Sequence, residues 1–205
     1  MKKTRFNLIA AVLFLLAGAF SASAQKYEVG ISLGGMITSD RTIQFPPGSI
    51  DIKASLTALV NFSTRLANFK AASLHLEFPF AGAGNTNLTS SNPLLPRNYS
   101  SIFFSPGIKL KFLPGRRVSP YAAIGGGFAR FDESGTLLNG QPNPGSKGKT
   151  RGVLDYGGGL DFRLLKFLAL RGEIRDFVSG SPSFNFPVTG KQHNILTSAG
   201  VVFRL

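Results

Sequence analysis

Through the middle of eight strand-like segments of the chain, one set of alternating positions carries no charged residue. Successive side chains of a β-strand point to opposite faces of a sheet, so each alternate set lies on one face. A charge on a face that meets hydrocarbon costs about 2–4 kcal/mol at mid-depth, so an uncharged face suits lipid contact. The segments are 27–37, 50–62, 69–80, 98–112, 120–131, 150–163, 167–178 and 191–205.

The connections between these segments alternate in length. The long ones are 38–49, 81–97, 132–149 and 179–190, and the short ones are 63–68, 113–119 and 164–166. Membrane barrels have short turns on one side, long loops on the other and an even number of strands. The two patterns together predict an all-β fold, an eight-stranded antiparallel up-and-down transmembrane β-barrel over residues 25–205.

The first 24 residues have the three parts of a secretory signal peptide. A basic start, an apolar run and small residues suited to cleavage follow one another at residues 2–5, 8–20 and 22–24. The apolar run is shorter than the roughly 20 residues that a spanning helix needs. We therefore predict that residues 1–24 are cleaved on export and that the rest reaches the cell outer membrane.

The opposite face of the same segments carries charges. Its acids are Glu28, Asp51, Glu77, Asp155, Asp161 and Glu173, and its bases are Lys53, Lys109, Lys111, Arg163, Arg171 and Arg175. An eight-stranded barrel is just wide enough for side chains to fill, and an unpaired buried charge is very costly. We expect all of these residues except Asp51 to form a lumen charge network that closes the barrel. The expected pairs join Lys109, Arg163, Arg171 and Arg175 to Glu77, Asp155, Asp161 and Glu173.

The sequence contains two histidines. His75 shares the charged face with Ser73 and Glu77, and a lipid-modifying enzyme needs a base beside a nucleophile. Residues two apart on a strand are about 6.6–7 Å apart, which argues against direct hydrogen bonds between their side chains. We therefore expect no catalytic or metal-binding residue and no cofactor.

Prolines and glycines mark irregular points in the expected strands. Pro106 lies inside segment 98–112, where its missing N–H would interrupt the pairing, so we predict a bulge at residues 105–107. The glycine runs at 125–127 and 157–159 precede no expected helix, so we interpret them as sites of strand curvature rather than phosphate loops.

Aromatic and basic residues gather where the short turns are expected. Aromatic rings are typical of lipid–water interfaces in membrane barrels, and basic residues near a charged surface contribute about 1 kcal/mol each. The pattern favours contact with phospholipid and lipopolysaccharide headgroups over nucleic acid. The aromatic residues are Tyr27, Phe62, Phe69, Phe112, Tyr121, Phe162, Phe167 and Phe203, and the basic ones are Lys26, Arg65, Lys70, Arg116, Arg117, Lys166 and Arg204.

Three further segments have a familiar form. They are Pro120-Tyr121 followed by Gly125-Gly126-Gly127, the segment 170–177, and the closing series Ala199, Val201, Phe203 and Leu205. With these features the chain resembles the outer-membrane β-barrel family that includes the OmpA-type and OmpX-type transmembrane domains. The resemblance implies that the barrel-assembly machinery reads the last strand, although Leu205 replaces the usual terminal aromatic residue.

These observations predict a monomeric barrel that is mainly structural or surface-binding, in the manner of an adhesin, and not an enzyme. Loops on a rigid scaffold commonly carry binding, so 81–97 and 132–149 are the expected contact sites for a ligand that the sequence does not identify. Three alternatives stay open: a small pore for solutes, a lipid-A-modifying enzyme, and a soluble periplasmic barrel that carries an apolar ligand.

Overall fold

The computed structural model describes residues 26–43, 48–186 and 190–205, and the predicted signal peptide lies outside this range. In the described part, no helix is both long and apolar enough to span a membrane. This part of the chain forms twelve strands. They are β1 (Tyr27–Thr38), β2 (Arg41–Ile43), β3 (Gly48–Ile52), β4 (Ser55–Asn68), β5 (Ala72–Thr89), β6 (Asn98–Phe104), β7 (Gly107–Phe112), β8 (Val118–Glu133), β9 (Lys149–Arg163), β10 (Leu168–Gly180), β11 (Lys191–Gln192) and β12 (Asn194–Arg204).

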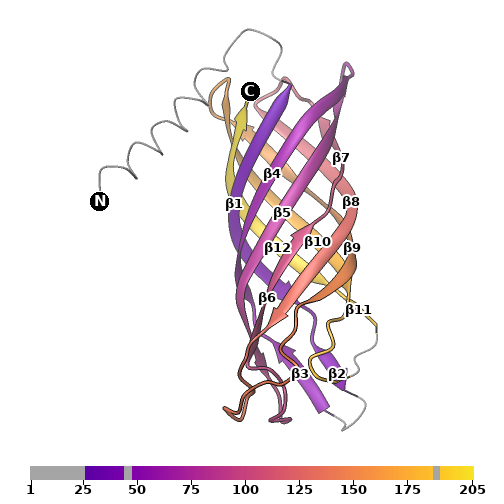
Figure 1. The fold of residues 1–205 in the computed structure, drawn as a ribbon. Coiled ribbons are helices and arrows are strands. Elements are labelled where there is room, and N and C mark those ends of the chain that lie inside the picture. The colour runs from indigo at the N-terminus through magenta and orange to yellow at the C-terminus, as the bar shows by residue number, and fades with distance from the viewer. Residues whose placement is uncertain (1–25, 44–47, 187–189) are drawn as a thin grey trace, which may run out of the picture.

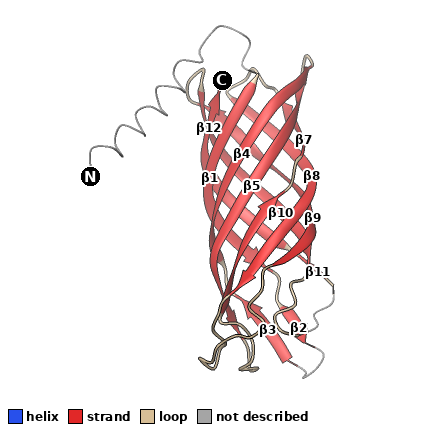
Figure 2. Ribbon diagram, viewed as in Figure 1, coloured by secondary structure: helices blue, strands red, loops and turns tan. Residues whose placement is uncertain are grey.

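The long strands pair in antiparallel fashion around a closed ring (Figures 1 and 2). β1 pairs with β4 on one side and with β12 on the other, and the ring continues through β10, β9 and β8. β5 pairs with β4, and β6 and β7 share the last place, because each pairs with both β5 and β8. With β6 and β7 counted as one interrupted strand, this is the predicted eight-stranded barrel.

The short and long connections lie at opposite ends of the barrel, as predicted (Figure 1). The short turns are 69–71, 113–117 and 164–167. The start of β1 and the end of β12 lie beside these short turns, where the Tyr27 N–H donates to the Leu205 carbonyl at 3.1 Å. The predicted loop 81–97 is too long, since β5 continues to Thr89 and its residues 80–83 still pair with β4 and β6.

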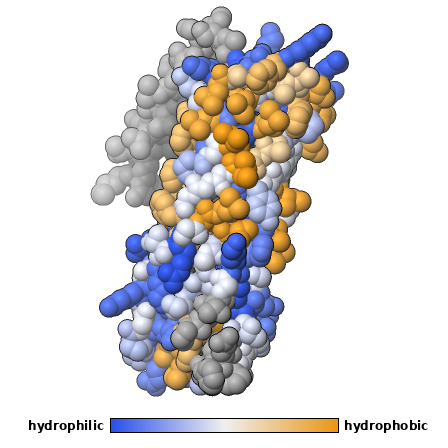
Figure 3. Space-filling view, turned by 90° about the vertical axis from the view of Figure 1, so that its right-hand side faces the viewer, coloured by the Kyte–Doolittle hydropathy of each residue, from blue (hydrophilic) through white to orange (hydrophobic). Residues whose placement is uncertain are grey.

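The uncharged face points outward, where Ile31, Leu56 and Ile174 are exposed. In Figure 3, apolar side chains cover the half of the visible surface that lies near the short turns, and polar side chains cover the part nearer the long loops. Ile52 is the exception, because it is buried. The chain leaves the ladder at residues 53–54, between β3 and β4, and this break shifts the alternation by one position.

Replacing Ile124 by arginine tests the outward assignment. Ile124 lies in mid-strand on the outer face and is 50% exposed. We expect Ile124→Arg to lower the free energy of unfolding in lipid vesicles by about 2–4 kcal/mol, measured by urea titration with circular dichroism. Leu165, which is equally exposed at 50%, is the matched control in a short turn, where Leu165→Arg should cost about 0–1 kcal/mol. Equal losses at the two positions would contradict the assignment.

The interruption at Pro106 is a gap in the ladder rather than a bulge. β6 ends at Phe104 and β7 begins at Gly107. The register is the same on both sides of the gap, so two residues face two on each neighbouring strand and no residue is inserted. The flanking pairs are Phe104 with Phe80 and Phe128, and Gly107 with Glu77 and Gly125. The predicted bulge is therefore wrong. The missing N–H of proline interrupts the ladder without shifting its register, and the Pro106 carbonyl still accepts a hydrogen bond from the Gly126 N–H at 3.0 Å.

Candidate functional site

Charged side chains fill the half of the lumen next to the short turns. No residue that contributes one is more than 7% exposed, and among the described residues the set contains five acids and five bases. We call this set the charge cluster. It consists of Glu28, Glu77, Asp155, Asp161, Glu173, Lys109, Lys111, Arg171, Arg175 and Arg204. Its formal charges cancel, which is the condition for keeping so many ionised groups away from bulk water.

Arg175 spans the diameter of the barrel. Its guanidinium lies 2.7 Å from Glu77, 2.7 Å from Asp155 and 3.1 Å from Glu173. β10, which carries Arg175, is four strands away from β5, which carries Glu77, in either direction around the ring. Three hydrogen bonds donated by one arginine therefore connect opposite walls across the lumen.

A second group of ion pairs lies around Asp161. Arg171 holds this carboxylate with two parallel hydrogen bonds of 2.8 and 3.0 Å, a geometry that is stronger than a single contact. Lys111 contacts the same carboxylate at 2.6 Å. Lys109 connects the two groups, because its ammonium lies 3.3 Å from Glu28 and 3.7 Å from Glu77.

Tyr121 contacts the charge cluster and does not lie at the lipid interface where the sequence placed it. Its hydroxyl donates to Glu173 at 2.9 Å, and the Arg171 guanidinium lies 4.8 Å from its ring centroid. Gly159 on β9 leaves the space that the ring occupies, since a Cβ at this position would lie 2.7 Å from the tyrosine hydroxyl. The interface prediction for Tyr121 is wrong because its alternate position points into the lumen.

The structure brings together every residue of the expected lumen network except Lys53 and Arg163. Lys53 is exposed in the break between β3 and β4, outside the lumen. Arg163 is half-buried at the end of β9, and the described residues offer it no ion pair. Arg204, expected on the rim, is instead buried, with its Nε 3.7 Å from Glu28. The alternation of β12 turns Arg204 inward together with Val202.

His75 lies in the lumen as expected, but its surroundings differ from the prediction. Ser73 Oγ and His75 Nε2 are 2.9 Å apart, so the argument that residues two apart cannot make contact was wrong. The two side chains lean toward each other on one face. Glu77 is hydrogen-bonded to Asn61 and Arg175, while His75 Nδ1 has no partner among the described residues. The serine, histidine and carboxylate therefore do not form a hydrogen-bonded chain.

Aromatic side chains fill the lumen nearer the long loops. Successive ring centroids are 5.1 to 6.0 Å apart, a spacing typical of favourable aromatic pairs. We call these residues the aromatic plug, which runs through Phe177, Phe103, Phe131, Tyr99 and Phe184. Phe184 comes from the connection between β10 and β11, so a loop residue completes the plug. Sequence analysis missed the plug, although four of its members lie at inward alternate positions.

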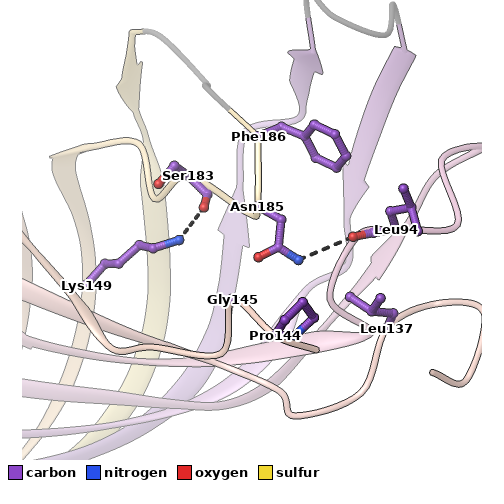
Figure 4. A pocket seen from close by; sticks show the side chains of 8 residues that line it. All are labelled: Leu94, Leu137, Pro144, Gly145, Lys149, Ser183, Asn185 and Phe186. Atoms are coloured by element: carbon purple, nitrogen blue, oxygen red, sulfur yellow. Dashed lines mark hydrogen bonds between the residues drawn. The ribbon is translucent and has the colours of Figure 1, made fainter. Parts of the chain in front are cut away.

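A pocket of about 900 Å³ opens beyond the plug at the long-loop end (Figure 4). We call it the loop-end pocket. Three connections and the start of β9 form its walls, and Phe186 joins it to the plug by packing against the buried core. The pocket is lined by Leu94, Leu137, Pro144, Gly145, Lys149, Ser183, Asn185 and Phe186.

Hydrogen bonds fix the walls of the loop-end pocket. The Asn185 amide donates to the Leu94 carbonyl at 3.3 Å and to Asn143 Oδ1 at 2.9 Å, which ties all three connections together. Lys149 donates to the Ser183 carbonyl and, at 2.7 Å, to the buried carboxylate of Glu133. Burial raises the pKa of Glu133 and outweighs the lowering effect of Lys149.

The outer face has a polar group where its apolar part ends. Asp176 accepts hydrogen bonds from the Tyr156 hydroxyl at 2.9 Å and lies 2.6 Å from His193 Nδ1. The uncharged set expected from the sequence stopped at Ile174, one outward position before Asp176. These polar groups therefore mark the long-loop limit of the lipid-facing surface, and the barrel projects beyond the membrane at this end.

The closed ring, the lipid-facing surface and the filled lumen define an outer-membrane β-barrel. The sequence matches the outer membrane protein beta-barrel domain family over residues 10–203, and the chain belongs to this family. The predicted fold and the predicted outer-membrane location are confirmed.

Solved structures of bacterial surface proteins have a similar fold. Neisserial surface protein A matches with 14% identity and a TM-score of 0.55, over 87% of this chain and 97% of that one. OprG of Pseudomonas aeruginosa matches with 11% identity and a TM-score of 0.55, over 89% and 96%. The N-terminal barrel domain of OprF from the same organism has 11% identity and a TM-score of 0.52, over 89% and 100%. Comparison with curated proteins gives no match.

Proposed function

We propose that this protein is a sealed outer-membrane barrel that presents a binding site at its long-loop end, with neither conduction nor catalysis of its own. The observation that carries the proposal is the salt-bridged Arg175, which connects opposite walls through Glu77, Asp155 and Glu173. The aromatic plug lies in series with it. A solute would have to displace both layers to pass.

The balance of lumen charges favours this function over a small pore. A pore that selects ions carries an excess of one charge along its lining. The charge cluster instead has equal numbers of acids and bases within the described residues, and all of them are buried. The long-loop end, in contrast, offers the loop-end pocket to the outside. The soluble-carrier alternative is overturned, because the family is one of outer-membrane proteins.

Single-channel recording in planar lipid bilayers tests the seal. We expect the folded protein to give no stable conductance step, because the charge cluster and the plug both fill the lumen. A porin in the same lipid is the positive control, and the shift in gel migration on boiling verifies that the inserted protein is folded. A stable, large conductance from the folded wild-type protein would refute the sealed barrel.

A further inference from the structure

The loop-end pocket has the size and the lining of a small-molecule site. Its volume of about 900 Å³ lies within the range of about 300–1,000 Å³ that is typical of such sites. Apolar groups of Leu94, Leu137, Pro144 and Phe186 form most of its wall. Leu94 is 51% exposed to water although it stands beside these other apolar groups, so a ligand with an apolar body would gain by covering it.

The loop-end pocket has little freedom to collapse, because its walls are in contact with one another. A Cβ at Gly145 would lie 2.0 Å from Asn185 Oδ1, so the two connections meet with no space between them. Asn185 itself adopts a positive φ of 63°, a conformation that its hydrogen bonds to Leu94 and Asn143 hold in place. Phe186 rests on the buried core below. A preformed wall lowers the entropic cost of binding.

The polar groups of the pocket limit the charge of the ligand. The Lys149 ammonium has three donors, and the described residues accept two of them, through Glu133 and the Ser183 carbonyl. The third donor is left for an acceptor on a ligand. The buried carboxylate of Glu133 neutralises Lys149, so the pair offers no net positive charge to a ligand carboxylate, and a ligand cation would meet the ammonium.

We propose that the loop-end pocket binds an uncharged, mainly apolar small molecule that carries one hydrogen-bond acceptor, which Lys149 contacts. The inference rests on the proposed function, because it names the class of ligand for the same long-loop end. Apolar walls would hold the body of the molecule, and the single ammonium donor would orient it.

Three probes with the same ring system separate the contributions of apolar contact, the hydrogen bond and ligand charge. 2-Acetylnaphthalene has a neutral acceptor, naphthalene has none, and 2-naphthoate is an anion. The protein is reconstituted in lipid nanodiscs with ¹³C-labelled leucine methyl groups, and the shifts of Leu94 and Leu137 are followed by NMR. We expect saturable shifts and the tightest binding for 2-acetylnaphthalene, about fivefold tighter than for naphthalene, since one hydrogen bond contributes about 1 kcal/mol. Absence of saturable shifts with all three probes, or tighter binding of 2-naphthoate, would overturn the proposal.

A double variant removes the donor without leaving a buried charge. Lys149→Met combined with Glu133→Gln should abolish the fivefold preference for 2-acetylnaphthalene over naphthalene. Lys147→Met, which changes an exposed lysine in the connection directly before β9, should preserve this preference. A preference that survives in the double variant would overturn the role of Lys149. Failure of binding would leave the absence of conductance intact, whereas a conducting wild type would refute the sealed barrel and leave the methyl shifts unchanged.

Discussion

Arg175→Met is expected to lower the free energy of unfolding by about 3–5 kcal/mol, which is the usual cost of removing one partner from a buried charge pair. The substitution keeps a long side chain but leaves Glu77, Asp155 and Glu173 without their shared cation. The chain contains no tryptophan, so unfolding by urea in lipid vesicles is best followed by circular dichroism and by gel migration.

The matched control is Arg130→Met on the outer face. Arg130 also has a carboxylate partner, Asp132 at 3.0 Å, but its side chain is 54% exposed. Water and salt screen such a pair, so the control should unfold at the same urea concentration as the wild type. If Arg175→Met unfolds together with Arg130→Met, the charge cluster does not hold the barrel together in the way described.

Phe103→Ala is the second large change, with an expected loss of about 3–5 kcal/mol for a buried phenylalanine. The ring of Phe103 lies between two other rings of the aromatic plug, 5.1 Å from Phe177 and 5.8 Å from Phe131 between centroids. Truncation would leave a cavity that the barrel walls cannot close, because their positions are fixed by the strand pairing. The same urea titration measures the loss.

Phe80→Ala is the control that distinguishes the loss of a ring of the plug from the loss of any aromatic ring on a barrel strand. Phe80 is also on a barrel strand, but it points outward and is 47% exposed. Lipid chains can replace the contacts of an outward ring, so its removal should cost clearly less than that of Phe103. Equal losses for Phe80→Ala and Phe103→Ala would contradict the special role of the plug.

The two faces of the barrel were predictable from the sequence because a strand alternates with a period of two. This period places Glu173 and Arg175 on one face and Ile174 on the other, and the alternation of loop lengths together with the uncharged face indicated which face is turned to lipid. The ion-pair partner of each inward charge was harder to predict from the sequence. Arg175 reaches Glu77, 98 residues earlier in the chain, because their strands lie opposite each other in the closed ring, and no local spacing encodes that distance.

Some errors occurred where the alternation is broken or does not apply, whereas Tyr121 and Arg204 were misplaced although the regular alternation turns both inward. The break at residues 53–54 reversed the two faces, so Ile52 and Lys53 were assigned to the wrong sides. Phe184 lies in a connection, where no period exists to reveal that its ring enters the lumen. Phe103 and Phe177, in contrast, lie at inward positions and could have been identified together with the charges.

The contact that Arg175 makes across the diameter has a consequence for assembly order. Glu77 and Arg175 lie half a circumference apart, and the final seam between β1 and β12 must form before the two walls face each other at the observed distance. A half-built sheet in the bilayer would therefore leave the Glu77 carboxylate without its arginine, while Arg175 would keep only Asp155 and Glu173 on β9 and β10. Such a species is strongly disfavoured in hydrocarbon, so insertion and closure are expected to occur as one concerted event rather than hairpin by hairpin.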